Sequence, residues 1–281
     1  MKCKMKYDVW KRNLSVEREF RNSLEYLVTI FRKICDMSEG NQTVYFNRMQ
    51  NFQQSEEYQS YITSIVRRMV NPIFASNYST WRRAARAATE SRLVYNNLLR
   101  ELREGLGLEL ETQVEENARL IRTLPTDTAN KAVSDIARLS VEGLRASEIA
   151  EQIKKYTDKH ARASARLIAR TEVSKTSTAI TQSRSKKLGL NWYVWRTAQD
   201  GKRVREQHRI MEGVLVNWNN PPSPEELDGL PSVGNYHAGC VWNCRCYAEP
   251  LIEVDDVHWP HKVHIGNQIK QMSKKEFEQI G

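Results

Sequence analysis

The sequence of 281 residues contains no long hydrophobic run. A membrane-spanning helix needs about 20 consecutive apolar residues, and no stretch of the chain approaches that length. Basic residues stand at the N-terminus, but no apolar region follows them, so we expect no signal peptide. These absences predict a protein of the cytoplasm that has no membrane partner.

Cysteine is scarce, and its five residues make an odd number. An odd count argues against a fully paired disulfide framework, and reduced thiols or metal ligands are the states expected in a cytoplasm. No two cysteines have the Cys-x-x-Cys spacing of a standard zinc finger or ribbon. A metal site in this chain would therefore need a different arrangement of ligands.

Acidic residues are outnumbered in the first two thirds of the chain. Residues 1–190 hold 33 Lys and Arg but 22 Asp and Glu, whereas residues 191–281 hold 10 and 12. A basic region of this kind indicates contact with a polyanion such as nucleic acid. It is equally typical of solvated helices whose ion pairs join positions i and i+4.

Apolar residues recur at spacings of three and four through the first 190 residues, which predicts helices. Ser55 is the expected cap of the second helix, and Asn71-Pro72 is its expected end because proline disfavours helical backbone before it. The expected helices cover about 20–34, 55–71, 79–104, 110–124 and 132–139, then a short helix after Ser147 and a long helix over 158–188.

After Gly189 the pattern becomes one of strands and turns. We expect strands over 191–196, 214–216 and 245–248, a short helix over 204–211, a loop over 219–236 and a terminal helix from Ser273. The predicted fold class is α+β, with an elongated, mostly α-helical N-terminal region and a small C-terminal α+β module. The predicted ranges are 1–130 for the helical region, 131–252 for the long helix 158–188 with the module 190–252, and 253–281 for a polar tail.

Five residues with metal-ligand chemistry gather within 39 positions of the C-terminal third: His208, His237, Cys240, Cys244 and Cys246. Zinc is usually held by four thiolates or imidazoles in tetrahedral geometry. If residues 244–246 are extended, the two outer cysteines point to the same face. One structural zinc ion is therefore a hypothesis, with reduced cysteines that pack in a core or a disulfide as the alternatives.

His208 has three interpretations, as a metal ligand, as a general base, or as a histidine that hydrogen-bonds a loop carbonyl. The second interpretation makes the protein a metal-dependent nuclease or hydrolase that uses His208 with Cys240, Cys244 and Cys246. Such a site keeps an open position and a nearby acid or base, yet no Asp or Glu stands between Val233 and Tyr247. Three thiolates and one imidazole would instead form a closed, structural site.

An ordered set of motifs over about residues 130–250 resembles the phage Mu F-like minor head proteins, also called phage head morphogenesis proteins. Its members are Arg170-Thr171-Glu172, Trp195, Asp200, Arg203-x-Arg205-x-x-His208, Gly213 and Cys244-Arg245-Cys246. The chain departs from the family pattern at the last motif, where a histidine and a proline are expected close before the first cysteine. Here His237 stands seven residues before it.

The resemblance implies a non-enzymatic virion component of a tailed double-stranded DNA phage or prophage. Such proteins associate with the portal inside the head, having entered it during assembly in the host cytoplasm, and aid head assembly and DNA packaging or ejection. The implied partners are the portal protein, non-specific double-stranded DNA, and a scaffold or major capsid protein. Candidate contacts with DNA or with an acidic portal surface are Arg67, Arg68, Arg82, Arg83, Arg86, Lys186 and Lys187.

Overall fold

The structure, a computed structural model, describes residues 10–87, 96–97, 100, 107–140, 146–199 and 204–280. Helices dominate the first two thirds of the described residues, and a five-stranded sheet follows, which confirms the α+β class. The chain divides into two compact units. Unit 1 takes its residues from Met1–Asn13, Pro72–Leu110 and Val173–Gly281, and unit 2 from Leu14–Asn71 and Glu111–Glu172.

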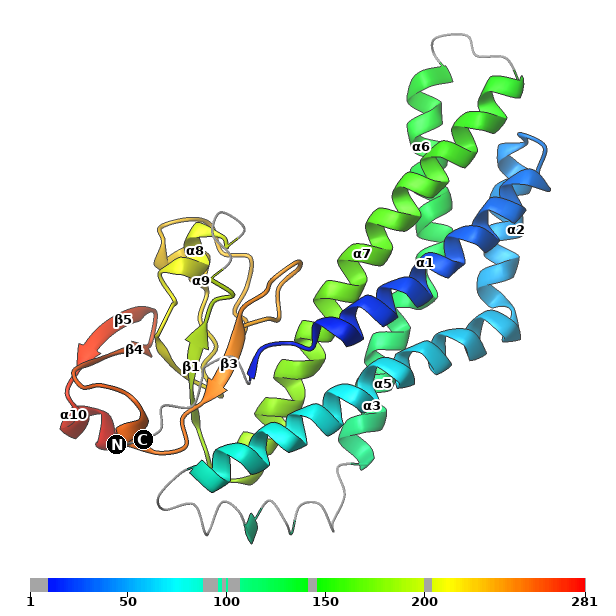
Figure 1. Cartoon of the computed structure of the whole chain (residues 1–281). Helices are drawn as coiled ribbons and strands as arrows, with labels where there is room; N and C mark the ends of the chain where they lie inside the picture. The colour runs from blue at the N-terminus through cyan, green and yellow to red at the C-terminus, as the bar shows by residue number, and fades with distance from the viewer. Residues whose placement is uncertain are drawn as a thin grey trace. The chain divides into compact units, whose positions relative to one another are not determined.

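Unit 2 is helical (Figure 1). Its elements are α1 (Leu14–Asp36), α2 (Gln42–Gln54), the first part of α3 (Glu56–Ala87), most of α5 (Gly107–Arg122), α6 (Leu124–Ser140) and the first part of α7 (Ala146–Lys187). The stripe predicted from Phe20 to Ile34 is buried along α1, because residues three and four apart share one face of a helix. Ser55 accepts a hydrogen bond from the Tyr58 amide at 3.2 Å and so caps α3, as predicted.

Two helices each join segments that were predicted to be separate. Helix α3 continues through Pro72 to Ala87 and takes in the start of the helix predicted over 79–104. Proline inside a helix costs about 3 kcal/mol, but Ile73 and Trp81 beyond it are almost fully buried and extend the apolar stripe. Helix α7 starts at Ala146, so the short helix and the long helix over 158–188 are one element, which neither Gly nor Pro interrupts.

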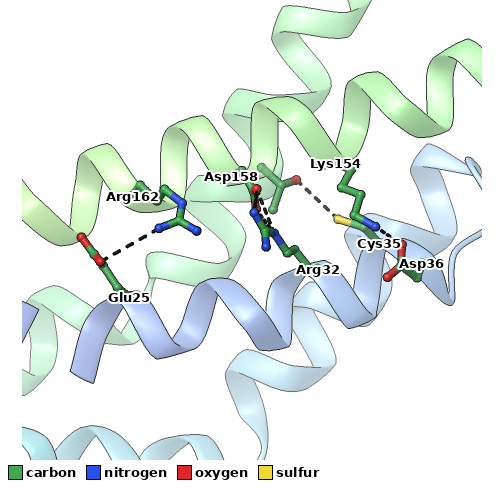
Figure 2. A network of polar contacts seen from close by, with 8 residues as sticks. Glu25, Arg32, Cys35, Asp36, Lys154, Asp158 and Arg162 are labelled. Atoms are coloured by element: carbon green, nitrogen blue, oxygen red, sulfur yellow. Dashed lines mark hydrogen bonds and ion pairs between the residues drawn. The ribbon is translucent and has the colours of Figure 1, made fainter. Parts of the chain in front are cut away.

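Polar contacts join α1 to the first part of α7 within unit 2. Figure 2 shows the Arg32 guanidinium, whose Nε donates to the Asp158 carboxylate oxygens at 2.7 and 2.8 Å. One turn further along, Lys154 lies 2.8 Å from the Asp36 carboxylate. The second pair is exposed and contributes little to stability.

Unit 1 contains the sheet, in the strand order β3-β1-β2-β4-β5. The strands are β1 (Trp192–Arg196), β2 (Leu215–Asn217), β3 (Tyr247–Pro250), β4 (His261–Ile265) and β5 (Gln268–Met272). Only β2 and β4 pair in parallel. The unit also has the short helices α8 (Glu206–Arg209), α9 (Pro224–Leu227), η3 (Val254–Asp256) and α10 (Lys274–Glu278), of which α8 and α9 lie at one end of β1 (Figure 1).

The residues assigned to a polar tail, 253–281, are part of this sheet. They supply β4, β5 and α10, and only α10, capped by Ser273, was expected. The two strands were missed because only His264 and Val263 of β4 are buried, so their apolar alternation is weak.

Strand β1 is buried on both faces, because successive side chains of a strand point in opposite directions. Tyr193 and Trp195 join one apolar cluster, with Met211, Val214, Val216, Trp218, Ala238, Cys244, Cys246 and Ala248. Trp192 and Val194 join another, with Leu215, Leu251, Val263 and Phe277. Within the part of the chain that the structure describes, no helix has an apolar stretch long enough to cross a bilayer.

Candidate metal centre

Three of the five predicted ligands meet in unit 1. His208 lies on α8, and Cys244 and Cys246 lie just before β3. The Nδ1 atom of His208 is 3.5 Å from Sγ of Cys244 and 3.4 Å from Sγ of Cys246. The ligand atoms of the three residues all lie within 4.8 Å of one another, and each residue is at most 5% exposed.

These separations are the ones that a zinc ion would require. With Zn–S near 2.3 Å, Zn–N near 2.0–2.1 Å and a tetrahedral angle, the nitrogen and each sulfur should be about 3.5–3.6 Å apart. The two measured separations fall within about 0.2 Å of that value. A tetrahedral ion can therefore occupy the centre with little rearrangement of the three side chains.

Backbone hydrogen bonds at β1 hold α8 in place. The chain leaves β1 after Arg196 and returns at Gly213, whose amide donates to the Trp195 carbonyl at 2.9 Å. Trp195 in turn donates to the Val214 carbonyl at 2.8 Å. Gly213 has a φ of +77°, which closes this loop without strain. The Trp195 ring then packs edge-on against His208, 5.7 Å between centroids, and fixes the imidazole.

Hydrogen bonds join His208 to Tyr236 and Tyr236 to Glu225, and we call these three residues the relay. The Tyr236 hydroxyl donates to the Glu225 carboxylate at 2.8 and 2.9 Å. Because its single proton is used there, the hydroxyl oxygen accepts from Nε2–H of His208, at 3.0 Å. Burial and the hydrogen bond to Glu225 raise the pKa of Tyr236, so the phenol keeps its proton. The other ring nitrogen of His208, Nδ1, faces the two sulfurs.

The relay was not expected from the sequence, which places Glu225 and Tyr236 in a predicted loop. That segment forms α9 and then returns, and the Tyr236 amide donates to the Pro222 carbonyl at 2.9 Å. Glu225 is 8% exposed. The fold thus links the Glu225 carboxylate to His208 through the Tyr236 hydroxyl. The sequence did not indicate this, because no Asp or Glu stands between Val233 and Tyr247.

The two cysteines differ in their proton affinity. The Cys246 thiol donates to Cys244 and, with His208, lowers the pKa of Cys244 well below its usual value. The same contact raises the pKa of Cys246 well above its usual value. The pair therefore shares one proton, which a bound metal ion would displace.

A cavity of about 100 Å³ opens beside the cluster. Its lining consists of Ala198, Val204, Arg205, His208, Asn243, Cys244, Arg245 and Cys246. Two arginines, Arg205 and Arg245, therefore line the space next to the three candidate ligands. One of them, Arg205, also donates to the Trp242 carbonyl at 2.7 Å.

His237 and Cys240 lie outside this group of three. The ring of His237 contacts the Tyr193 hydroxyl through Nδ1 and the Gln182 amide through Nε2, each at 3.2 Å. Burial raises the pKa of the Cys240 thiol to about 12, which keeps it protonated. The five predicted ligands are thus divided between a cluster of three and two residues with other partners.

The remaining motif residues take several roles. Arg170 lies 3.6 Å from the Glu17 carboxylate in unit 2, and Thr171 and Glu172 are buried in α7. Asp200 and Arg203 lie outside the described residues. Only Trp195, Arg205, His208, Gly213 and Cys244-Arg245-Cys246 are gathered at the candidate metal centre or form its support.

The predicted basic contacts also differ among themselves. Arg67 makes a two-pronged ion pair with Glu111 at 2.6 and 2.7 Å, and Arg82 is half-buried over the Tyr78 ring. The others are exposed: Arg68, Arg83, Arg86, Lys186 and Lys187.

Acid should destabilise unit 1 through His237. Burial, and secondarily the charge of Lys186, lower the pKa of His237 to about 4 from the ordinary 6.5. Above pH 6.5 the imidazole is neutral in the folded and the unfolded chain. Between pH 6.5 and 4 the unfolded chain binds a proton that the folded protein does not, so the free energy of unfolding falls, by on the order of 3 kcal/mol.

Urea unfolding at a series of pH values measures this loss. His237→Gln removes the titrating group, so its unfolding free energy should fall less steeply from pH 6.5 to 4. Equal slopes for the two proteins would contradict the assignment. Both proteins should keep a smaller decrease of the unfolding free energy with falling pH, because burial also lowers the pKa of His264.

The chain is similar to a protein family and to a bacterial protein. A profile of the family described as "Phage Mu protein F like protein" matches residues 131–249. A Haemophilus influenzae protein described as uncharacterized is 29% identical over 164 residues, which are 57% of this chain and 33% of that protein. The match thus spans about a third of the relative's length. No solved structure gives a significant match.

Proposed function

We propose that the chain belongs, through residues 131–249, to the phage Mu F-like family of head morphogenesis proteins, and that it is a minor capsid protein of a tailed double-stranded DNA phage or prophage. In this proposal it is assembled in the host cytoplasm, becomes part of the virion and associates with the portal inside the head. There it aids head assembly and DNA packaging or ejection. The family match is the observation that supports it best.

The distribution of charge supports contact with a polyanion, and it favours unit 1 over unit 2 as the part of the chain that makes this contact. Residues 1–13, 72–110 and 173–190, all in unit 1, hold 15 Lys and Arg against 5 Asp and Glu. Unit 2 holds 18 and 17. Because Arg67 is also paired with Glu111, we assign the contact to the exposed bases of unit 1, namely Arg83, Arg86, Lys186 and Lys187.

The proposal includes no catalytic step. The alternative, a metal-dependent nuclease or hydrolase at His208, needs a carboxylate or another base beside the metal. Among the described residues that line the cavity at the cluster, none is Asp or Glu. The nearest relay ends at Glu225, whose two oxygens both accept from Tyr236. The cavity beside the cluster therefore lacks the second acid or base that hydrolysis needs.

Co-expression with the portal protein of the same phage tests the proposal. A complex that survives gel filtration in physiological salt is expected, with scaffold or major capsid protein as further candidates in the same assay. Heads assembled without this protein should contain less DNA or fail to release it. A full yield of infectious particles in its absence would overturn the assignment.

Non-specific DNA binding should depend on two lysines at the end of α7. In Lys186→Gln/Lys187→Gln, the slope of log affinity against log salt should become shallower by about 0.9 for each phosphate that is no longer neutralised. Fluorescence anisotropy with a labelled duplex measures it. The control Lys33→Gln/Lys131→Gln removes two exposed lysines of unit 2 and should leave the slope unchanged. Equal slopes in all three proteins would contradict DNA binding at this end of α7.

A further inference from the structure

We propose that His208, Cys244 and Cys246 bind one zinc ion whose fourth coordination position faces the arginine-lined cavity and takes water or a small anion. This differs from the closed site with four protein ligands that the cysteine spacing suggested. It does not depend on the proposed role in head assembly. Its basis is the placement of three ligands, one relay and one cavity.

The relay of Glu225, Tyr236 and His208 favours a metal site over two cysteines that only fill space in the core. Packing of two thiols needs no polar neighbours, yet Glu225 is buried here and oriented through Tyr236 onto His208. Its effect is to hold Nδ1 of the imidazole toward the two sulfurs. Metal-bound histidines are typically oriented by a hydrogen bond on the other ring nitrogen in this way.

The donor set selects the metal. Two thiolates and one imidazole suit a borderline-soft ion, whereas calcium and magnesium require oxygen ligands. The nitrogen–sulfur separations of 3.4 and 3.5 Å match tetrahedral zinc geometry. All three ligands are buried, which shields the thiolates from oxidation and the metal from competing ligands.

The fourth position is open within the part of the chain that the structure describes. The only group of His, Cys, Asp and Glu ligands found there has three members, and His237 and Cys240 contact other partners. A zinc ion with two thiolates has no net charge, so the positive charges of Arg205 and Arg245 favour an anion beside it. A cavity of about 100 Å³ has room for a few waters or a small anion, and is too small for a nucleotide.

Metal analysis of the untagged full-length protein, purified under reducing conditions without chelator, tests the ligand set. One zinc per chain is expected in the wild-type protein and in His237→Gln and Cys240→Ser. His208→Ala and Cys244→Ser should lose it, with circular dichroism to confirm that they fold. Absence of zinc from the wild-type protein after incubation with zinc chloride would overturn the site.

The open position has its own test, which uses the wild-type protein and so does not depend on a variant that folds. Cobalt replaces zinc, and its visible absorption reports the ligands. Azide should shift the d–d bands, because it can enter the fourth position. An unchanged spectrum at saturating azide, or loss of metal in Asp200→Asn, would show that the protein supplies all four ligands.

Tyr236→Phe separates the relay from general packing. It keeps the ring and removes the hydroxyl that holds His208, so zinc affinity should fall about 10- to 100-fold in a competition titration with a chromophoric chelator. The matched control is Tyr193→Phe, whose hydroxyl contacts His237, and its zinc affinity should stay at the wild-type value. An equal loss in both variants would contradict the role of the relay.

Discussion

Trp195→Ala is expected to lower the free energy of unfolding of unit 1 by about 3–5 kcal/mol, the usual cost of replacing a buried large aromatic residue by alanine. The Trp195 side chain is fully buried in the core cluster of β1. Its ring lies 5.7 Å from the ring of His208 and 6.2 Å from that of Tyr236. Since whole domains are stable by about 5–15 kcal/mol, this loss is a large part of the stability of the unit.

The comparison with Trp242→Ala makes this prediction specific. Trp242 belongs to the same region, but it is 49% exposed, and its ring carries only the ammonium group of Lys175 at 5.1 Å. Its loss should cost about 1 kcal/mol or less. Urea unfolding followed by circular dichroism measures both changes. Similar losses in the two variants would mean that the cluster around Trp195 is not a core.

Gly239→Ala should be the second most damaging change, at roughly 3 kcal/mol, because two costs add. Gly239 has a φ of +87°, which strains a residue that has a Cβ. That Cβ would also lie 2.9 Å from the Cys246 carbonyl oxygen and 3.0 Å from Oγ1 of Thr178. Thr178 cannot move freely, since it donates to the Ala238 carbonyl at 2.7 Å.

Gly229→Ala isolates the strain from the clash. Gly229 has a similar φ of +77°, but nothing lies within 4 Å of its added Cβ. It should lose only the conformational term, about 1–2 kcal/mol. Because Gly239 presses on the backbone of Cys246, its variant should also bind zinc more weakly, and Gly229→Ala should not. Equal stability losses would show that the packing of Gly239 against Cys246 is loose.

The sequence predicted the helices whose apolar stripes are long and failed where the stripe was short. Helix α1 carries eight buried residues and was found, whereas α2 buries only Tyr45 and Met49 and was not. Local signals also misled at Pro72, where burial on both sides keeps the helix intact. Hydrophobic periodicity and composition describe one helix or strand at a time, and they do not show which other element will bury it.

The same limit applies to the candidate metal centre. Clustering in sequence indicated His208, Cys244 and Cys246, because scarce ligand types within a short span are informative. It also indicated His237, whose ring contacts Tyr193, and Cys240, and neither belongs to the group of three. Spacing cannot show which way a loop turns. For that reason the sequence did not predict that Glu225 and Tyr236 belong to the site. Their position near the imidazole follows from the fold of α9 and the segment after it.

Strands β4 and β5, which begin at His261 and Gln268, lie beyond residue 249, where the match to the phage Mu F-like family ends. Leu215 of β2 pairs with Val263, and the apolar cluster that contains Trp192 also needs Phe277. A fragment trimmed to the matched span would leave β2 as an unpaired edge strand beside an uncovered apolar face. An exposed edge strand of this kind can pair with another chain and so promote aggregation. The unit that folds is therefore longer than the unit that resembles its relatives, and any shortened version should keep residues to at least 278.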